Sequence, residues 1–141
     1  MKKIVILLLI SLFAGTATFA QGIDFEHDAS WASIVAKAKK ENKLIFLDAY
    51  TSWCGPCKLM QARVFPDQSL GTFHNDNFVN AKIDMETGEG PQLAAQYRIK
   101  GYPTLFYIDP NSLQVVHSVL GYRNVEQLIA TGKTALNKKP I

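Results

Sequence analysis

The segment Trp53-Cys54-Gly55-Pro56-Cys57-Lys58 constrains this chain more than any other, because it holds both cysteines and follows directly on the apolar run at residues 44–50. A nearly continuous apolar run of this length is typical of a strand that helices cover on both faces. Two thiols with two residues between them, placed where a strand turns into a helix, indicate a redox pair that opens and closes a disulfide. We therefore predict that Cys54 and Cys57 form a redox centre.

The first twenty residues have the composition of a secretory signal peptide. Lys2 and Lys3 precede an apolar run of about ten residues, and small residues end the segment at Thr18-Phe19-Ala20. An uncleaved membrane anchor is the alternative, but the run falls short of the roughly 20 apolar residues that span a bilayer. We predict a signal peptide at residues 1–20 and one domain at residues 21–141, the only domain for which a chain of this length has room.

The charge of the chain gives no sign of an anionic partner. Loss of Lys2 and Lys3 with the signal peptide lowers the formal net charge from +3 to +1. The basic clusters at residues 37–40 and 138–139 are better explained as solvated helix faces and ends than as binding patches. We therefore expect neither nucleic acid nor a membrane surface as a partner.

The histidines and cysteines do not indicate a metal site or a covalent haem. His27, His74 and His117 lie in unrelated segments and are interpreted as ordinary surface or hydrogen-bonded residues. A structural zinc site needs four ligands, usually from two cysteine pairs, and this chain has one pair. Covalent haem needs a histidine directly after the second cysteine, where Lys58 stands. We expect no metal and no cofactor.

Hydrophobic periodicity, caps and turn residues predict alternating helices and strands. The predicted helices begin near Ser30, Cys54, Asp67, Pro91 and Asn124, and the predicted strands cover residues 44–49, 78–84, 104–108 and 113–120. Pro66 is expected to kink or end the second helix. Such an alternation gives an α/β domain with a central mixed sheet and helices on both faces.

Three features in the right order resemble the thioredoxin superfamily: Asp48 six residues before Cys54, the cysteine hexapeptide, and the Tyr102-Pro103 pair. Residues 64–70 are similar to the stretch that follows the redox pair in exported thiol–disulfide interchange proteins. The resemblance covers roughly residues 30–136. It implies the thioredoxin fold and a thiol–disulfide oxidoreductase.

The position of Cys54 at a helix N-terminus makes it the predicted attacking residue. Unpaired N–H groups and the helix dipole stabilise a thiolate there, and a pKa lowered from about 8.5 to about 7 makes about half of the thiol ionised at neutral pH. Cys57, one turn further along, is then the resolving residue. Pro56 stiffens the loop, and in the family a Gly-Pro pair here goes with a reducing potential, about −270 mV in thioredoxin.

Asp48 is the predicted proton acceptor for Cys57. Burial without a partner raises the pKa of a carboxyl group, and the matching Asp of thioredoxins takes this role. A structural Asp bonded to the backbone is the alternative. The sequence departs from the family in one respect: Asn80 aligns with the lysine that thioredoxins usually carry near this Asp, although Lys82 lies on the same strand face two residues further on.

The Tyr102-Pro103 pair matches the family's cis-proline site opposite the cysteines. The resemblance implies a cis bond, whereas base frequencies alone favour trans. The Tyr102 backbone can then pair with an extended client segment beside Cys54. Tyr122 joins the rim in one interpretation and is a packed surface aromatic in the other. The predicted substrate-binding residues are Trp53, Gly55, Pro56, Tyr102 and Pro103.

Together these features predict a periplasmic or secreted monomer that reduces disulfide-containing client proteins. Cys54 attacks, a mixed disulfide forms, and Cys57 resolves it. A reductant outside the cytosol needs electrons, and we expect a membrane protein to donate them. The alternatives are a non-catalytic binding module, a redox sensor, and a disulfide oxidase or isomerase.

Overall fold

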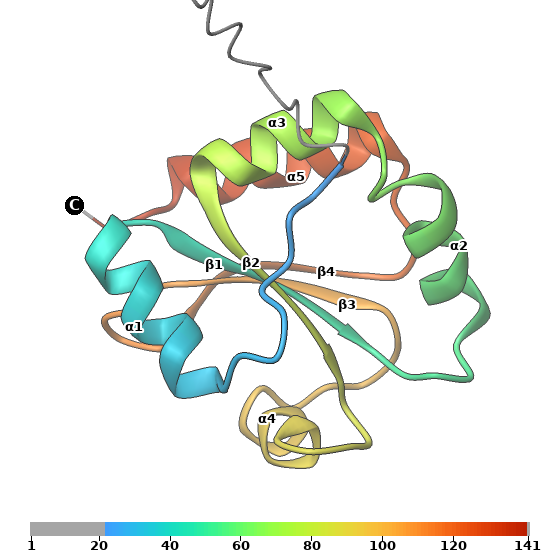
Figure 1. Cartoon of the computed structure of the whole chain (residues 1–141), viewed down its shortest axis with the longest axis horizontal. Helices are drawn as coiled ribbons and strands as arrows, with labels where there is room; N and C mark the ends of the chain where they lie inside the picture. Colours follow the sequence, from blue (N-terminus) through green and yellow to red (C-terminus); the bar gives the residue numbers. More distant parts are fainter. Residues whose placement is uncertain (1–21, 141) are drawn as a thin grey trace, which may run out of the picture.

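The computed structural model describes residues 22–140, so the predicted signal peptide at residues 1–20 lies outside the described residues. The helices and strands follow one another as α1 (Trp31–Glu41), β1 (Leu44–Tyr50), α2 (Gly55–Arg63), α3 (Gln68–Asn77), β2 (Phe78–Asp84), α4 (Gly90–Gln96), β3 (Thr104–Ile108), β4 (Val115–Leu120) and α5 (Val125–Asn137). The strands form one sheet in the order β2-β1-β3-β4 (Figure 1). β1 is parallel to β2 and antiparallel to β3, and β4 is antiparallel to β3, which confirms the predicted mixed sheet.

β1 lies in the middle of the domain because both of its faces are apolar. Leu44 and Phe46 face a cluster to which α2, α3 and α5 contribute. Ile45 and Leu47 face a second cluster, to which α1 and α4 contribute. Figure 1 shows α3 and α5 along one side of the sheet and α1 and α4 on the other. The unbroken apolar run is therefore the signature of a strand between two cores.

Capping residues set several helix starts where the sequence predicts them. The Ser30 and Asp67 side chains accept hydrogen bonds from backbone N–H groups in the first turns of α1 and α3. Asn124 and Gln127 form a complete capping box at α5. Pro66 lies between α2 and α3, so the predicted break of the helix is confirmed.

The β3–β4 hairpin is shorter than predicted. β4 begins at Val115 rather than at residue 113, because Leu113 has a φ of +58° that a strand does not accommodate. The Asp109 carboxylate accepts hydrogen bonds from the backbone N–H groups of Asn111 and Ser112 and so builds the turn. Within residues 22–140, no helix is both long enough and apolar enough to cross a membrane.

An N-terminal segment, residues 22–28, lies against the sheet before α1 begins, and the sequence gives no sign of it. Phe25 forms an isolated parallel bridge with Asn80 of β2, and the Ile23 N–H donates to the Phe65 carbonyl at 2.8 Å. Gly22 and Gly71 of α3 are in backbone contact: a Cβ on Gly71 would lie 2.1 Å from the Gly22 oxygen. Glycine at position 71 is thus required for this close approach.

Candidate redox site

The two cysteines form a disulfide at the N-terminus of α2. Cys54 is the N-cap residue, and its sulfur accepts a hydrogen bond from the Cys57 N–H at 3.2 Å. Pro56 lies in the first turn, where its missing N–H costs no helical hydrogen bond. The positive end of the helix therefore faces the Cys54 sulfur, as the predicted thiolate requires.

Both cysteines are nearly closed to solvent: Cys54 is 3 % exposed and Cys57 is 1 % exposed. The residues around Cys54 are open, because Trp53, Gly55 and Pro56 are all exposed. A docking protein therefore contacts Trp53, Gly55 and Pro56 before it reaches the Cys54 sulfur. The sequence pattern, which predicts only the position of Cys54 on the helix, gives no sign of this shielding.

Asp48 is buried beneath this helix without a partner. It is 1 % exposed, and neither carboxylate oxygen has a hydrogen-bond partner among the described residues. This excludes the alternative of a structural Asp bonded to the backbone. Desolvation raises the pKa of Asp48 to about 7, and the nearby positive charge of Lys82 opposes that rise. A carboxyl group with this pKa exchanges a proton near neutral pH.

Alternation along β1 gives Asp48 its orientation. Asp48 lies two residues after Phe46 and so shares the sheet face that packs against α2. Cys57 lies on the buried side of α2 together with Met60, which belongs to the same apolar cluster. The strand and the helix therefore place the carboxyl group and the second cysteine on the same side of the sheet.

Lys82, not Asn80, is the residue opposite Asp48, so the positive charge near this carboxyl group comes from two positions further along β2. In the parallel pairing of β1 with β2, Asp48 pairs with Lys82 and Phe46 pairs with Asn80. The Asn80 side chain instead donates to the Asp24 carbonyl and the Asn75 side chain. Strand register sets this difference, and sequence similarity alone does not determine it.

The predicted substrate-binding residues gather beside the disulfide. The Tyr102–Pro103 bond is cis, as the resemblance implies. Trp53 is 64 % exposed, and its ring meets that of Tyr102 edge-on with centroids 6.0 Å apart. Its indole N–H donates to both carboxylate oxygens of Glu86 at 3.0 Å. Glu86 is a residue that sequence reasoning missed, because it lies in a loop without a motif.

Leu120 and Tyr122 are also exposed, but only Leu120 lies close to the predicted substrate-binding residues. Leu120, at the end of β4, is 55 % exposed and lies beside Gly101. The alternation of β4 is a signal that could have identified it. Tyr122 is 39 % exposed and lines a hollow with Arg63 and Val64, beyond the end of α2. This position fits a surface aromatic, the second interpretation offered by the sequence.

The histidines lie apart from the disulfide. His74 is fully buried, and its Nε2 lies 3.2 Å from the Tyr107 hydroxyl. His117 Nδ1 lies 3.3 Å from the Lys138 amine, and His27 lines a hollow under the N-terminal segment. In the described part of the chain, no group of three or more His, Cys, Asp or Glu side chains is arranged to hold a metal ion.

Comparison with known proteins agrees with this geometry. The family model described as Thioredoxin matches residues 23–134. A thiol:disulfide interchange protein DsbD from Tatumella citrea is 27 % identical over 118 residues, which cover 82 % of this chain and 20 % of that protein. Thioredoxin-1 of Drosophila melanogaster is 37 % identical over 71 residues, 50 % of this chain and 62 % of that protein.

A solved structure is similar over almost its whole length. The solution structure of a candidate disulphide-isomerase from Bacteroides thetaiotaomicron has a TM-score of 0.73 and 37 % identity, and the match covers 86 % of this chain and 98 % of that one. The chain therefore spans one fifth of the DsbD protein and nearly all of the solved Bacteroides chain. The fold, the Cys54–Cys57 pair and the match to the family model establish that this chain belongs to the thioredoxin family, as a thioredoxin-like thiol–disulfide oxidoreductase.

Proposed function

We propose that this protein is exported and reduces disulfides in client proteins. The Cys54 thiolate attacks a client disulfide, and a Cys54–client disulfide forms while the other client sulfur leaves as a thiolate and takes up a proton. Cys57 then loses its proton to Asp48 and attacks the Cys54 sulfur. The second client thiolate leaves, so the client gains two electrons and the Cys54–Cys57 pair loses them.

The single observation that carries this proposal is the unpartnered Asp48 carboxyl group on the sheet face that packs against α2, whose buried side carries Cys57. A buried carboxyl group without hydrogen bonds is costly to the fold, and a use in the chemistry explains why the protein carries one here. With a pKa of about 7 it is half ionised at neutral pH, so it takes a proton from Cys57 and returns it to solvent. A buried thiol otherwise ionises with difficulty.

Clients dock on a rim made by the exposed residues Trp53, Gly55 and Pro56, with the half-buried Tyr102 and the buried Pro103 beside them. The Trp53 ring, held by Glu86 and Tyr102, forms one wall. The backbone beside the cis bond pairs with an extended client segment, in the manner of an added strand. The cysteines are shielded, so we expect clients whose disulfides lie in extended, accessible segments.

The reducing direction requires an electron donor. Outside the cytosol, a dithiol of a membrane protein is the class of donor that we propose, and similarity to DsbD supports it because that name describes thiol:disulfide interchange. Export is proposed from the composition of residues 1–20. N-terminal sequencing of the processed protein tests it: we expect Gln21 as the first residue, in an extracytoplasmic fraction.

Insulin reduction and the redox potential test the activity. We expect turnover with a potential near −270 mV, the value for a reducing thioredoxin. Cys54→Ser should abolish turnover, whereas Cys57→Ser should accumulate mixed disulfides whose clients can be identified. Absence of turnover in the native protein would leave a binding module or a sensor, and a Cys57→Ser protein that traps no client would contradict the proposed order of attack.

An isomerase is the second candidate, and the candidate disulphide-isomerase from Bacteroides is the observation that favours it. Isomerases attack and release without completing a net reduction, and they work at a more oxidising potential. A potential above about −150 mV, with recovery of activity from scrambled ribonuclease, would support this assignment over the reductase.

A further inference from the structure

Lys82 is held between two aromatic rings beside the redox site. Its ammonium nitrogen lies 5.7 Å from the ring centroid of Phe25 and 5.7 Å from that of Tyr50. Both distances are within the range of a cation–π contact. Tyr50 lies two residues after Asp48 on the same face of β1, whereas Phe25 belongs to the N-terminal segment. Residues from two distant parts of the chain therefore fix one ammonium group.

Phe25 is itself fixed by packing and by backbone hydrogen bonds. Its ring meets Phe65 edge-on at 5.2 Å and lies 6.3 Å from Phe46. The adjacent Glu26 N–H donates to the Asn80 carbonyl at 2.8 Å. The Phe25 ring thus packs on the core with one side and faces Lys82 with the other. Its position is therefore fixed by contacts within the protein.

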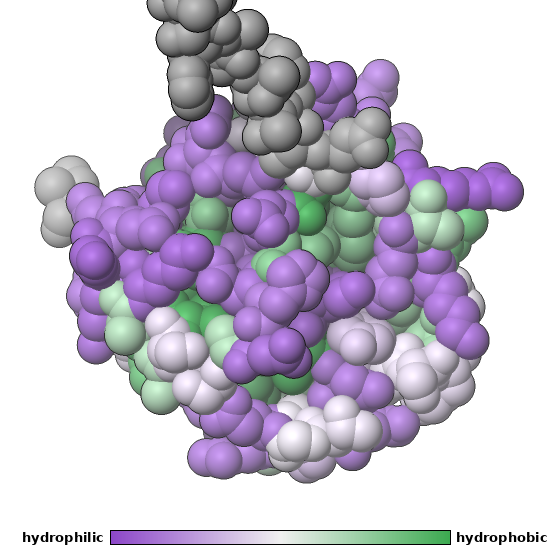
Figure 2. Space-filling view, in the orientation of Figure 1, coloured by the Kyte–Doolittle hydropathy of each residue, from purple (hydrophilic) through white to green (hydrophobic). Residues whose placement is uncertain are grey.

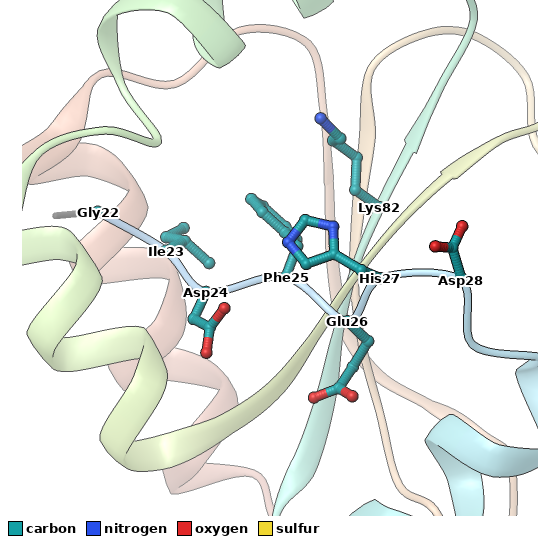
Figure 3. Close-up of a pocket in the computed structure, with 8 residues that line it drawn as sticks. All are labelled: Gly22, Ile23, Asp24, Phe25, Glu26, His27, Asp28 and Lys82. Atoms are coloured by element: carbon teal, nitrogen blue, oxygen red, sulfur yellow. The ribbon is translucent and has the colours of Figure 1, made fainter. Parts of the chain in front are cut away.

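The ring and the ammonium group border the same hollow. A cavity of about 640 Å³ lies under the N-terminal segment and is lined by residues 22–28 and Lys82 (Figure 3). In this view, Asp24 and Glu26 point away from Lys82, and the ring of His27 lies in front of the hollow. Hydrophilic side chains cover much of this face of the molecule, with apolar side chains visible between them (Figure 2). Among the described residues, Lys82 forms no ion pair with Asp24, Glu26 or Asp28, the three acidic residues of the segment.

The charged groups around Asp48 are few. Lys82 faces it from β2, Tyr50 lies on its own strand, and Cys57 lies on the buried side of α2. Asp84 follows on β2 opposite Tyr50. Lys82 is the one positive charge that acts on the Asp48 carboxyl group among the described residues. Movement of this ammonium group by a few ångströms changes the attraction, because the Coulomb energy depends on the distance between the two charges.

We propose that Phe25 is a positioning residue of the redox site: its ring, together with that of Tyr50, holds the Lys82 ammonium group beside Asp48, so the N-terminal segment sets how readily Asp48 accepts a proton. The role of Asp48 in turnover rests on the proposed function, whereas the effect of Phe25 on Asp48 does not. Loss of one ring lowers the occupancy of the lysine position by about two- to fivefold.

The test is a titration of the Asp48 carboxyl carbon by NMR in the oxidised protein, which requires no turnover. Lys82→Met should move the Asp48 midpoint upward by about one pH unit or more, the effect of losing a nearby opposite charge. Phe25→Leu keeps an apolar side chain but removes the ring, and it should move the midpoint in the same direction by a smaller amount. Phe25→Trp, which keeps an aromatic face, should leave the midpoint near that of the native protein.

Phe73→Leu is the matched control, because Phe73 packs on the same apolar cluster and makes no contact with Lys82. It should leave the Asp48 midpoint unchanged. All titrations are repeated in a His27→Gln background, so that a histidine titrating beside Lys82 is not mistaken for the effect. An unchanged midpoint in Phe25→Leu, or an equal change in Phe73→Leu, would overturn the proposal.

Activity is measured separately in the same variants. If the proposed function holds, the pH profile of insulin reduction should follow the NMR midpoint in Phe25→Leu and return in Phe25→Trp. If the native protein reduces no insulin, the proposed function fails while the NMR titration still decides the role of Phe25. The two failures are therefore distinguishable.

Discussion

Two buried titratable side chains, Asp48 and His74, lie toward opposite ends of the same sheet face. Asp48 lies near the end of β1 that leads to the disulfide, with both oxygens unpaired. His74 packs on the ring of Phe46 at 4.7 Å, toward the start of β1, and its Nε2 meets the Tyr107 hydroxyl. Burial raises the pKa of Asp48 to about 7 and lowers the pKa of His74 to about 3.

The difference shows that burial alone does not make a titratable group functional. Desolvation favours the neutral form of both side chains. The pKa of Asp48 is raised into the range of neutral pH, and its carboxyl group lies on the sheet face that packs against the redox helix. The pKa of His74 is lowered out of that range, and its ring lies among Phe46, Phe78 and Tyr107. We therefore propose a structural role for His74 and a catalytic role for Asp48, and each proposal can be tested.

The largest effect is expected for His74 in acid. The folded protein keeps His74 neutral while the unfolded chain binds a proton below pH 6.5, so the stability from this group is lost as the pH falls from about 6.5 to about 3. The full effect is roughly 5 kcal/mol. In urea unfolding, His74→Leu should cost stability at pH 7 and much less at pH 4. A cost independent of pH would contradict the assignment.

A slightly smaller effect of opposite sign is expected for Asp48. The folded protein holds its proton up to about pH 7 while the unfolded chain loses it near pH 4, so stability from this group is lost as the pH rises through that window, by roughly 4 kcal/mol. Asp48→Asn should therefore unfold at higher urea than the native protein at pH 8, and no such gain should appear at pH 4. Insulin turnover should fall roughly a hundredfold. Unchanged turnover would return Asp48 to a structural role.

Tyr107→Phe isolates the hydrogen bond that distinguishes His74 from Asp48. Removal of the hydroxyl leaves Nε2 buried without its partner, at a cost of about 1–3 kcal/mol in the free energy of unfolding. Tyr97→Phe is the control, because the Tyr97 hydroxyl makes only a 3.5 Å contact with the Leu113 carbonyl near the surface. Equal losses in the two variants would mean that the His74–Tyr107 hydrogen bond adds no more to the free energy of unfolding than the surface contact of Tyr97.

The smallest effect is expected at the exposed rim. Glu86→Gln weakens the bond to the Trp53 indole in a solvent-exposed setting, so the free energy of unfolding should change by less than about 0.5 kcal/mol. The Trp53 ring then moves more freely, and the KM for insulin should rise about twofold with kcat unchanged. A fall in kcat would instead connect Glu86 with the reacting sulfurs.

The sequence predicts most of the fold because its signals are local. Caps such as Ser30 and Asp67 depend on residues within one turn of the helix. The apolar composition of β1 is enough to predict that both faces of this strand are buried. The cysteine pair is similarly local, since the helix that follows Cys54 sets its environment. Asp48 is found by its charge within an apolar strand, and its missing hydrogen bonds are visible only in the structure.

What the sequence could not supply depends on contacts between distant residues. Strand register decides that Lys82 and not Asn80 faces Asp48. The bond from Trp53 to Glu86 joins residues 33 positions apart. The docking of residues 22–28 requires a glycine at position 71, where the backbone contacts that of Gly22. No local sequence pattern predicts this contact.

We expect the bridge between Phe25 and Asn80 also to affect the solubility of the protein. β2 and β4 are the outer strands of the sheet, and an outer strand invites pairing with a second molecule. Residues 22–28 occupy part of the β2 border through the Glu26–Asn80 hydrogen bond. A shortened chain that starts at Ser30 should uncover that border and aggregate during purification, so the first seven described residues also guard against self-association.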